Sequence, residues 1–155
     1  MTLGLAIREL HRSESMLARA LAALAENHVS ETEVHHVALD VRQWSVDHAE
    51  RLRAAGRARG ERLWRWPHVV DPRPALVRAA TRRDPALVLL ADLRRLHRDA
   101  AGVSLDWELL AQGAQALRDV ELVDLCRRCH PQTLRQMQWT NGMLKTLSPQ
   151  ALSAR

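Results

Sequence analysis

The sequence predicts an all-α, single-domain bundle in which four long helices form two hairpins joined by a long crossover. Three observations predict this fold class. Apolar residues recur at helical spacing along four long stretches of the chain. No stretch alternates strictly between apolar and polar residues, as a half-buried strand would. A long interval rich in proline and arginine separates the second stretch from the third, whereas the other connections are short.

The first hairpin is expected from helices at residues 3–27 and 31–56. The apolar face of the first helix is interrupted only by Glu14. Ser30 and Glu33 have the spacing of a capping box, which predicts the start of the second helix. The segment between the two helices is short enough for an antiparallel hairpin.

The second hairpin is expected from helices at 85–117 and 119–147, after a crossover at 57–84. Asp84 followed by proline is a typical N-cap and first helical position. Within the crossover, only the part near 74–81 is expected to form a short helix. Two hairpins with a long connection between the second and third helices are the connectivity of one subclass of four-helix bundles.

The number and distribution of charged residues indicate which classes of partner to expect. The 155-residue chain has 23 basic and 18 acidic residues and a net charge of +5, and the excess is spread along the sequence. A nucleic-acid-binding protein usually concentrates its basic residues in one stripe, so we do not expect nucleic acid as a partner. The stretch 51–68, which leads into the crossover, contains six arginines together with Trp64 and Trp66, a combination that can bind phosphates and stack on bases. We favour the alternative that these tryptophans cover one end of the bundle.

No window approaches the roughly 18 uninterrupted apolar residues of a membrane span, and the N-terminal stretch lacks the pattern of an export signal. We therefore expect a cytoplasmic protein with no membrane partner. In that compartment the two cysteines should be free thiols.

Three polar side chains stand where four-helix proteins place metal ligands. Ferritin-like di-iron proteins carry a Glu on the first helix, E-x-x-H on the second, a Glu on the third and E-x-x-H on the fourth. Glu14 interrupts the first apolar face, and His48 and His130 occupy the positions of the two histidines. The chain thus resembles the ferritin-like superfamily over roughly residues 3–58 and 85–147. The resemblance implies a ferritin-like four-helix bundle.

The chain also departs from that pattern. Ser45 and Arg127 stand three residues before His48 and His130, where the family has glutamates. Two iron ions need those carboxylates to balance their charge. The chain is therefore predicted to be a degenerate member without a di-iron centre or ferroxidase activity.

Glu14, His48, Asp106 and His130 are predicted to converge at mid-bundle, with Trp107 the alternative to Asp106 on the third helix. Two interpretations remain open. The favoured one is a buried hydrogen-bond network, in which Arg127 takes the charge of Glu14 or Asp106. The other is a single Zn or Fe ion held by the histidines and carboxylates.

The stretch "CRRCH" at 126–130 matches the C-x-x-C-H pattern of covalent haem attachment. Cys126 and Cys129 lie one helical turn apart among core leucines, and free cysteine is one of the most buried residue types. Core packing is therefore the preferred explanation, and haem is not expected.

These expectations support two functions. The first is a structural or protein-interaction module that binds a protein partner or self-associates, for example as a homodimer through an apolar helix face. The alternative is a mononuclear metal-binding protein with a redox role. Neither interpretation assigns a catalytic residue.

Overall fold

The computed structural model describes residues 2–63 and 84–153. Their helices are α1 (Leu3–Asn27), α2 (Thr32–Ala58), α4 (Pro85–Ala116) and α5 (Val120–Ser153), and these two ranges contain no strand. The predicted all-α four-helix bundle is confirmed. Observed and expected helix bounds agree within two residues, except that α5 continues further toward the C-terminus. The expected short helix near 74–81 lies outside the described residues.

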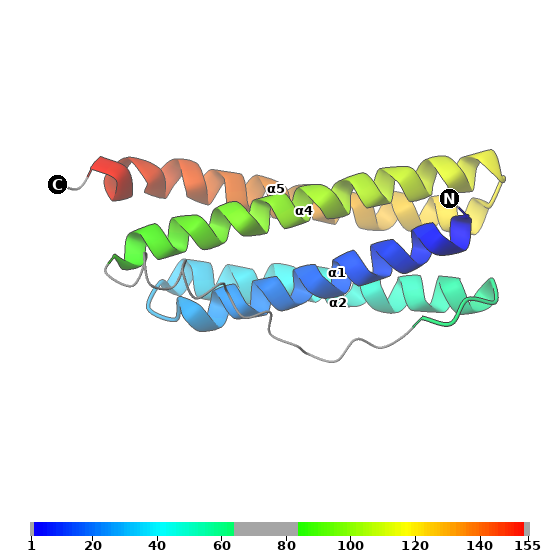
Figure 1. The fold of residues 1–155 in the computed structure, drawn as a ribbon, viewed down its shortest axis with the longest axis horizontal. Coiled ribbons are helices and arrows are strands. Elements are labelled where there is room, and N and C mark those ends of the chain that lie inside the picture. The colour runs from blue at the N-terminus through cyan, green and yellow to red at the C-terminus, as the bar shows by residue number, and fades with distance from the viewer. Residues whose placement is uncertain (1, 64–83, 154–155) are drawn as a thin grey trace.

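The four helices lie side by side along their lengths, and neighbouring helices run antiparallel (Figure 1). The pairs in contact correspond to the four sides of a square cross-section. α1 packs against α2 and α4, and α5 packs against the same two helices. Ser13 of α1 bonds to Asp106 of α4, and His28, the residue that follows α1, bonds to Asp92 of α4. The two helices therefore run in opposite directions. α2 and α4 therefore run parallel on one diagonal of the square, as expected for two hairpins joined by a crossover.

The core follows the apolar periodicity of the sequence. Leucine is the most frequent buried residue in α1 and α4, whereas α2 buries mainly smaller residues and α5 buries its two cysteines and several polar side chains. Trp107 is the largest fully buried side chain of the described residues. Each leucine removed from water contributes roughly 1.5–3 kcal/mol to folding, so this apolar interior supplies the main driving force. In the described part of the chain, no helix combines the length and apolar character needed to cross a membrane.

Of the two predicted helix N-caps, the one at the start of α4 is confirmed and the one at the start of α2 is wrong. Asp84 caps α4 as expected, because its carboxylate accepts a hydrogen bond from the Ala86 amide at 2.9 Å. The predicted capping box is wrong. α2 begins at Thr32 with Glu31 in the N-cap position and no side-chain cap, which leaves Ser30 outside the helix terminus. Glu33 lies in the first turn, where its charge still complements the helix dipole.

The turn between α4 and α5 is tight and well bonded. Arg118 adopts a left-handed backbone conformation with a φ of 56°, which reverses the chain after α4. The Asp119 amide donates back to the Ala114 carbonyl at 2.9 Å, and the Asp119 carboxylate accepts from the Leu122 amide at 3.1 Å. Asp119 thus ends one helix and caps the next.

Side-chain hydrogen bonds join the two hairpins at both ends of the bundle. At one end, Arg59 donates from Nε and Nη2 to the two carboxylate oxygens of Asp119, each at 2.7 Å. This fork joins the end of α2 to the turn before α5, and it lowers the pKa of the Asp119 carboxyl. At the other end, His28 Nε2 and Asp92 Oδ2 lie 2.8 Å apart and join α1 to α4. Both contacts link one hairpin to the other.

The Arg59–Asp119 fork should contribute measurable stability. Arg59→Lys keeps the charge but removes the planar fork, so we expect the free energy of unfolding to fall by about 1 kcal/mol. Chemical denaturation followed by circular dichroism measures the change. Arg127→Lys is the matched control, because Arg127 makes only a loose, exposed pair with Asp124 at 3.8 Å. Equal losses in the two variants would contradict a special role for the fork.

Candidate functional site

Glu14 lies at the centre of the bundle and has no exposed surface. It occupies an inward position of α1, one turn before Leu17 and one turn after Leu10. Its Oε1 accepts a hydrogen bond from Trp107 Nε1 at 2.7 Å and lies 2.8 Å from His48 Nδ1. A single carboxylate oxygen therefore joins α1 to both of its neighbours, α4 and α2.

His48 extends this network to the fourth helix. Its Nε2 lies 2.7 Å from the side-chain carbonyl oxygen of Gln132 on α5. The Trp107 ring meets the imidazole edge-on, with the ring centroids 5.6 Å apart and an interplanar angle of 86°. Because both partners of the imidazole are oxygen acceptors, both ring nitrogens donate, and this is the hydrogen-bonding pattern of an imidazolium.

The surroundings of His48 favour its charged form. Burial is the largest influence and acts to lower the pKa. Interactions with the side chains of Cys129, Glu14 and Gln132, together with the charge of Glu14, outweigh burial and raise the pKa of His48 to about 10. At neutral pH, Glu14 and His48 therefore form a buried ion pair.

Further polar side chains of α5 continue the network by one turn. Gln136 Nε2 donates to the Val41 carbonyl and to the Ser45 hydroxyl of α2, both at 2.9 Å. Thr133, one turn earlier on α5, is also fully buried. Three oxygens of this region, Glu14 Oε2, Thr133 Oγ1 and Gln136 Oε1, have no hydrogen-bond partner within the described ranges.

The structure joins Glu14 and His48 as predicted, but it gives Asp106 and His130 other partners. Asp106 accepts from the Ser13 hydroxyl at 2.7 Å, and His130 Nε2 lies 2.8 Å from the hydroxyl of Ser104. Across residues 2–63 and 84–153, no three His, Cys, Asp or Glu side chains form a group that could hold a metal ion. The predicted four-residue convergence is therefore wrong.

Helical geometry explains that error. Successive residues are 100° apart around a helix axis, so the inward position of Trp107 turns Asp106 toward the surface between α1 and α4. His130 faces α4 for the same reason, since Cys129 takes the inward position. The indole of Trp107 thus replaces the expected carboxylate.

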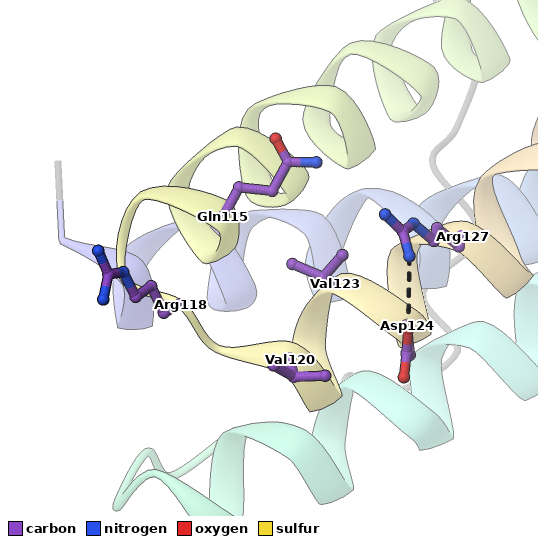
Figure 2. A pocket seen from close by; sticks show the side chains of 6 residues that line it. All are labelled: Gln115, Arg118, Val120, Val123, Asp124 and Arg127. Carbon is purple, nitrogen blue, oxygen red and sulfur yellow. Dashed lines mark ion pairs between the residues drawn. The ribbon is translucent and has the colours of Figure 1, made fainter.

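Arg127 is not part of the network. Its side chain is 72% exposed and lies 3.8 Å from Asp124 on the outer side of α5 (Figure 2). The expectation that Arg127 would pair with Glu14 or Asp106 is wrong, because the neighbouring Cys126 is the residue that points inward. The buried charge of Glu14 is balanced by His48 instead.

The two cysteines are core residues. Cys126 and Cys129 are both buried free thiols in α5, as the packing interpretation predicted. Burial and the neighbouring Cys129 raise the pKa of Cys126 to about 12, which keeps that thiol protonated and unreactive.

The sequence interpretation missed the polar side chains of α5. Gln132, Thr133 and Gln136 follow Cys129 at helical spacing and were not assigned to the core. The detectable signal was the lack of aliphatic residues at inward positions between Cys129 and Met143. Where apolar residues are missing from a buried face, polar ones must fill it and find partners.

A surface pocket of about 320 Å³ lies beside the α4–α5 turn, apart from the network residues (Figure 2). It is lined by residues on either side of the turn, namely Gln115, Arg118, Val120, Val123, Asp124 and Arg127. Two of its charged lining residues, Asp124 and Arg127, lie close together and pair with each other. The pocket contains no nucleophile, and neither Glu14 nor His48 lines it.

Comparisons with models of protein families, with curated proteins and with solved structures found no match.

The raised pKa of His48 predicts how stability depends on pH. A group whose pKa is higher in the folded than in the unfolded state contributes fully below its unfolded pKa, here about 6.5. The contribution should fall progressively above that pH and vanish as pH passes about 10. Unfolding free energies measured from pH 6 to pH 10.5 should show this decline. His48→Gln should flatten it, and the exposed His36→Gln should not; equal slopes in all three proteins would rule out the assignment.

Trp107→Phe tests the indole hydrogen bond. This change keeps most of the aromatic volume but removes a donor to a buried carboxylate, so we expect a loss of about 1–3 kcal/mol in unfolding free energy. Trp139→Phe is the matched control, because Trp139 Nε1 has no hydrogen-bond partner in the described ranges. A loss in the control as large as in Trp107→Phe would show that aromatic packing, rather than the hydrogen bond, is responsible.

Proposed function

We propose that this chain is a non-catalytic helical-bundle protein that acts as a structural or protein-interaction module. The observation that supports this proposal most directly is the self-contained pairing of Glu14 with His48. In such a pair, the carboxylate is neutralised by an imidazolium of the same chain, and no bound cation is needed. The network serves to align the four helices and does not perform chemistry on a substrate.

The competing function is a single Zn or Fe ion held by Glu14, His48 and His130. A metal would have to displace the proton from His48 and break its bond to Glu14, because a ligating imidazole nitrogen must be deprotonated. The bond between His130 and Ser104 would also have to break. These rearrangements weigh against resident metal and in favour of the structural role.

We further propose that the chain is a degenerate ferritin-like protein of the cytoplasm. The antiparallel neighbours and the parallel diagonal helices support the ferritin-like connectivity. Two buried free thiols one turn apart suit a reducing compartment. The retained Glu14 and His48 would then be remnants of a metal site that now has a structural use.

Self-association through the outer face of α4 would give this module its interaction surface. Leu105 and Leu109 lie one turn apart on that face and are 60% and 57% exposed. Gly102 lies one turn before Leu105, and open space surrounds the position where its Cβ would be. Two copies related by a two-fold axis would set these leucines against each other, with small residues permitting close approach. The occupant that we propose is therefore a second copy of this chain.

Metal analysis decides between the two functions. After incubation with excess zinc or ferrous iron and gel filtration, the protein should contain no stoichiometric metal, because the ligand atoms of Glu14 and His48 bond to each other. Mass spectrometry with inductively coupled plasma measures the metal content. One ion per chain in the wild type, lost in His48→Ala, would establish the metal-binding function instead.

Sedimentation analysis tests the proposed dimer. The wild type should sediment as a dimer, and the double variant Leu105→Glu, Leu109→Glu as a folded monomer, because four carboxylates would face one another across the axis. Leu39→Glu on the outer face of α2 is the control and should leave the dimer intact. A wild-type monomer at all concentrations, or a dimer in the double variant, would refute this interface.

A further inference from the structure

The centre of the bundle contains three buried side-chain oxygens that lack a hydrogen-bond partner among the described residues. Glu14 Oε2, Thr133 Oγ1 and Gln136 Oε1 have no partner among the described residues, and their side chains are at most 1% exposed. Both donors to Glu14 bond to its other oxygen, Oε1. Leaving a buried polar group unpaired costs roughly 1–3 kcal/mol, and more when the group is charged. Three such groups in one region indicate a shared partner.

The hydrogen-bond network places these residues within about one helical turn of one another along the bundle. Glu14 reaches α5 through His48, which bonds to Gln132, the residue next to Thr133. Gln136, one turn further along α5, bonds to Ser45, which lies one turn before His48 on α2. One helical turn spans about 5.4 Å, so these three buried side chains lie in one short section of the bundle.

The chemistry of the three atoms specifies the missing partner. A carboxylate oxygen and an amide oxygen only accept hydrogen bonds, whereas the threonine hydroxyl can also donate. The partner must therefore donate at least twice and can accept once. It should also be neutral, because Glu14 and His48 already balance each other and a further buried charge would have no counterion.

We propose that one internal water molecule occupies this position. It donates to Glu14 Oε2 and Gln136 Oε1 and accepts from the Thr133 hydroxyl. Three hydrogen bonds are the usual number for a buried water. The water would link α1 to α5, the diagonal pair of helices whose backbones make no close contact. This inference does not depend on whether the chain has a protein partner.

A high-resolution crystal structure of the wild-type chain tests the proposal directly. We expect one density peak within hydrogen-bond distance of Glu14 Oε2, Gln136 Oε1 and Thr133 Oγ1. In solution, a long-lived water there should give nuclear Overhauser cross-peaks to protons of Thr133. Absence of the density peak, or a protein donor bonded to Glu14 Oε2, would overturn the proposal.

Two variants and one soak sharpen the test. Thr133→Ser keeps the hydroxyl and should retain the water peak and the cross-peaks to side-chain protons of residue 133. Thr133→Val keeps the shape but removes the hydroxyl, so the water peak and the cross-peaks to the side chain of residue 133 should disappear. A peak that persists in Thr133→Val would refute the three-bond site. Crystals soaked in thallium(I) should show no anomalous signal at this position; a signal there would identify a monovalent cation and refute the neutral occupant.

Discussion

The centre of this bundle depends on one requirement, namely that the carboxylate of Glu14 must be hydrogen-bonded without access to solvent. An unpaired charge in such a position would cost several kcal/mol. The two donors come from different helices, His48 from α2 and Trp107 from α4. Sliding either helix by one residue would move its donor by 1.5 Å and rotate it by 100°, which breaks the contact. The apolar core drives assembly, whereas this carboxylate selects one alignment of the helices.

Polar contacts at three levels along the bundle together select one alignment of the helices. Arg59 with Asp119 fixes one end of the bundle, His28 with Asp92 fixes the other, and Glu14 with His48 fixes the middle. Leucine-rich faces can slide past each other with little change in buried area, so they specify register poorly. Contacts that require particular atoms to meet exclude the shifted alternatives. Replacing these polar groups by leucine could raise the stability and still reduce the uniqueness of the fold.

Apolar periodicity was sufficient to predict the fold, but only part of the site. It located four helices because apolar residues recur on each inward face over many turns. A single exception on a face therefore does not change the prediction of a helix. Glu14 and His48 were found because each interrupts such a face. Asp106 and His130 were misplaced because the apolar pattern locates the inward face of a helix only to within about one residue. Successive residues point 100° apart around the helix axis, so an error of one residue turns a side chain away from the core. The position of Gln132 depends on how α2 and α5 approach each other, which neither helix encodes alone.

The antiparallel packing of neighbouring helices has a consequence for the electrostatics of the site. Each helix carries a dipole, and in this arrangement the dipoles of adjacent helices oppose and largely cancel each other. Glu14, His48, Trp107 and Gln132 also lie more than one turn from every helix end, beyond the range over which a helix terminus influences charge. The field of the scaffold therefore contributes little at mid-bundle. Proton affinity there is determined by burial and by the immediate neighbours, so single substitutions among those neighbours can retune it without changing the fold.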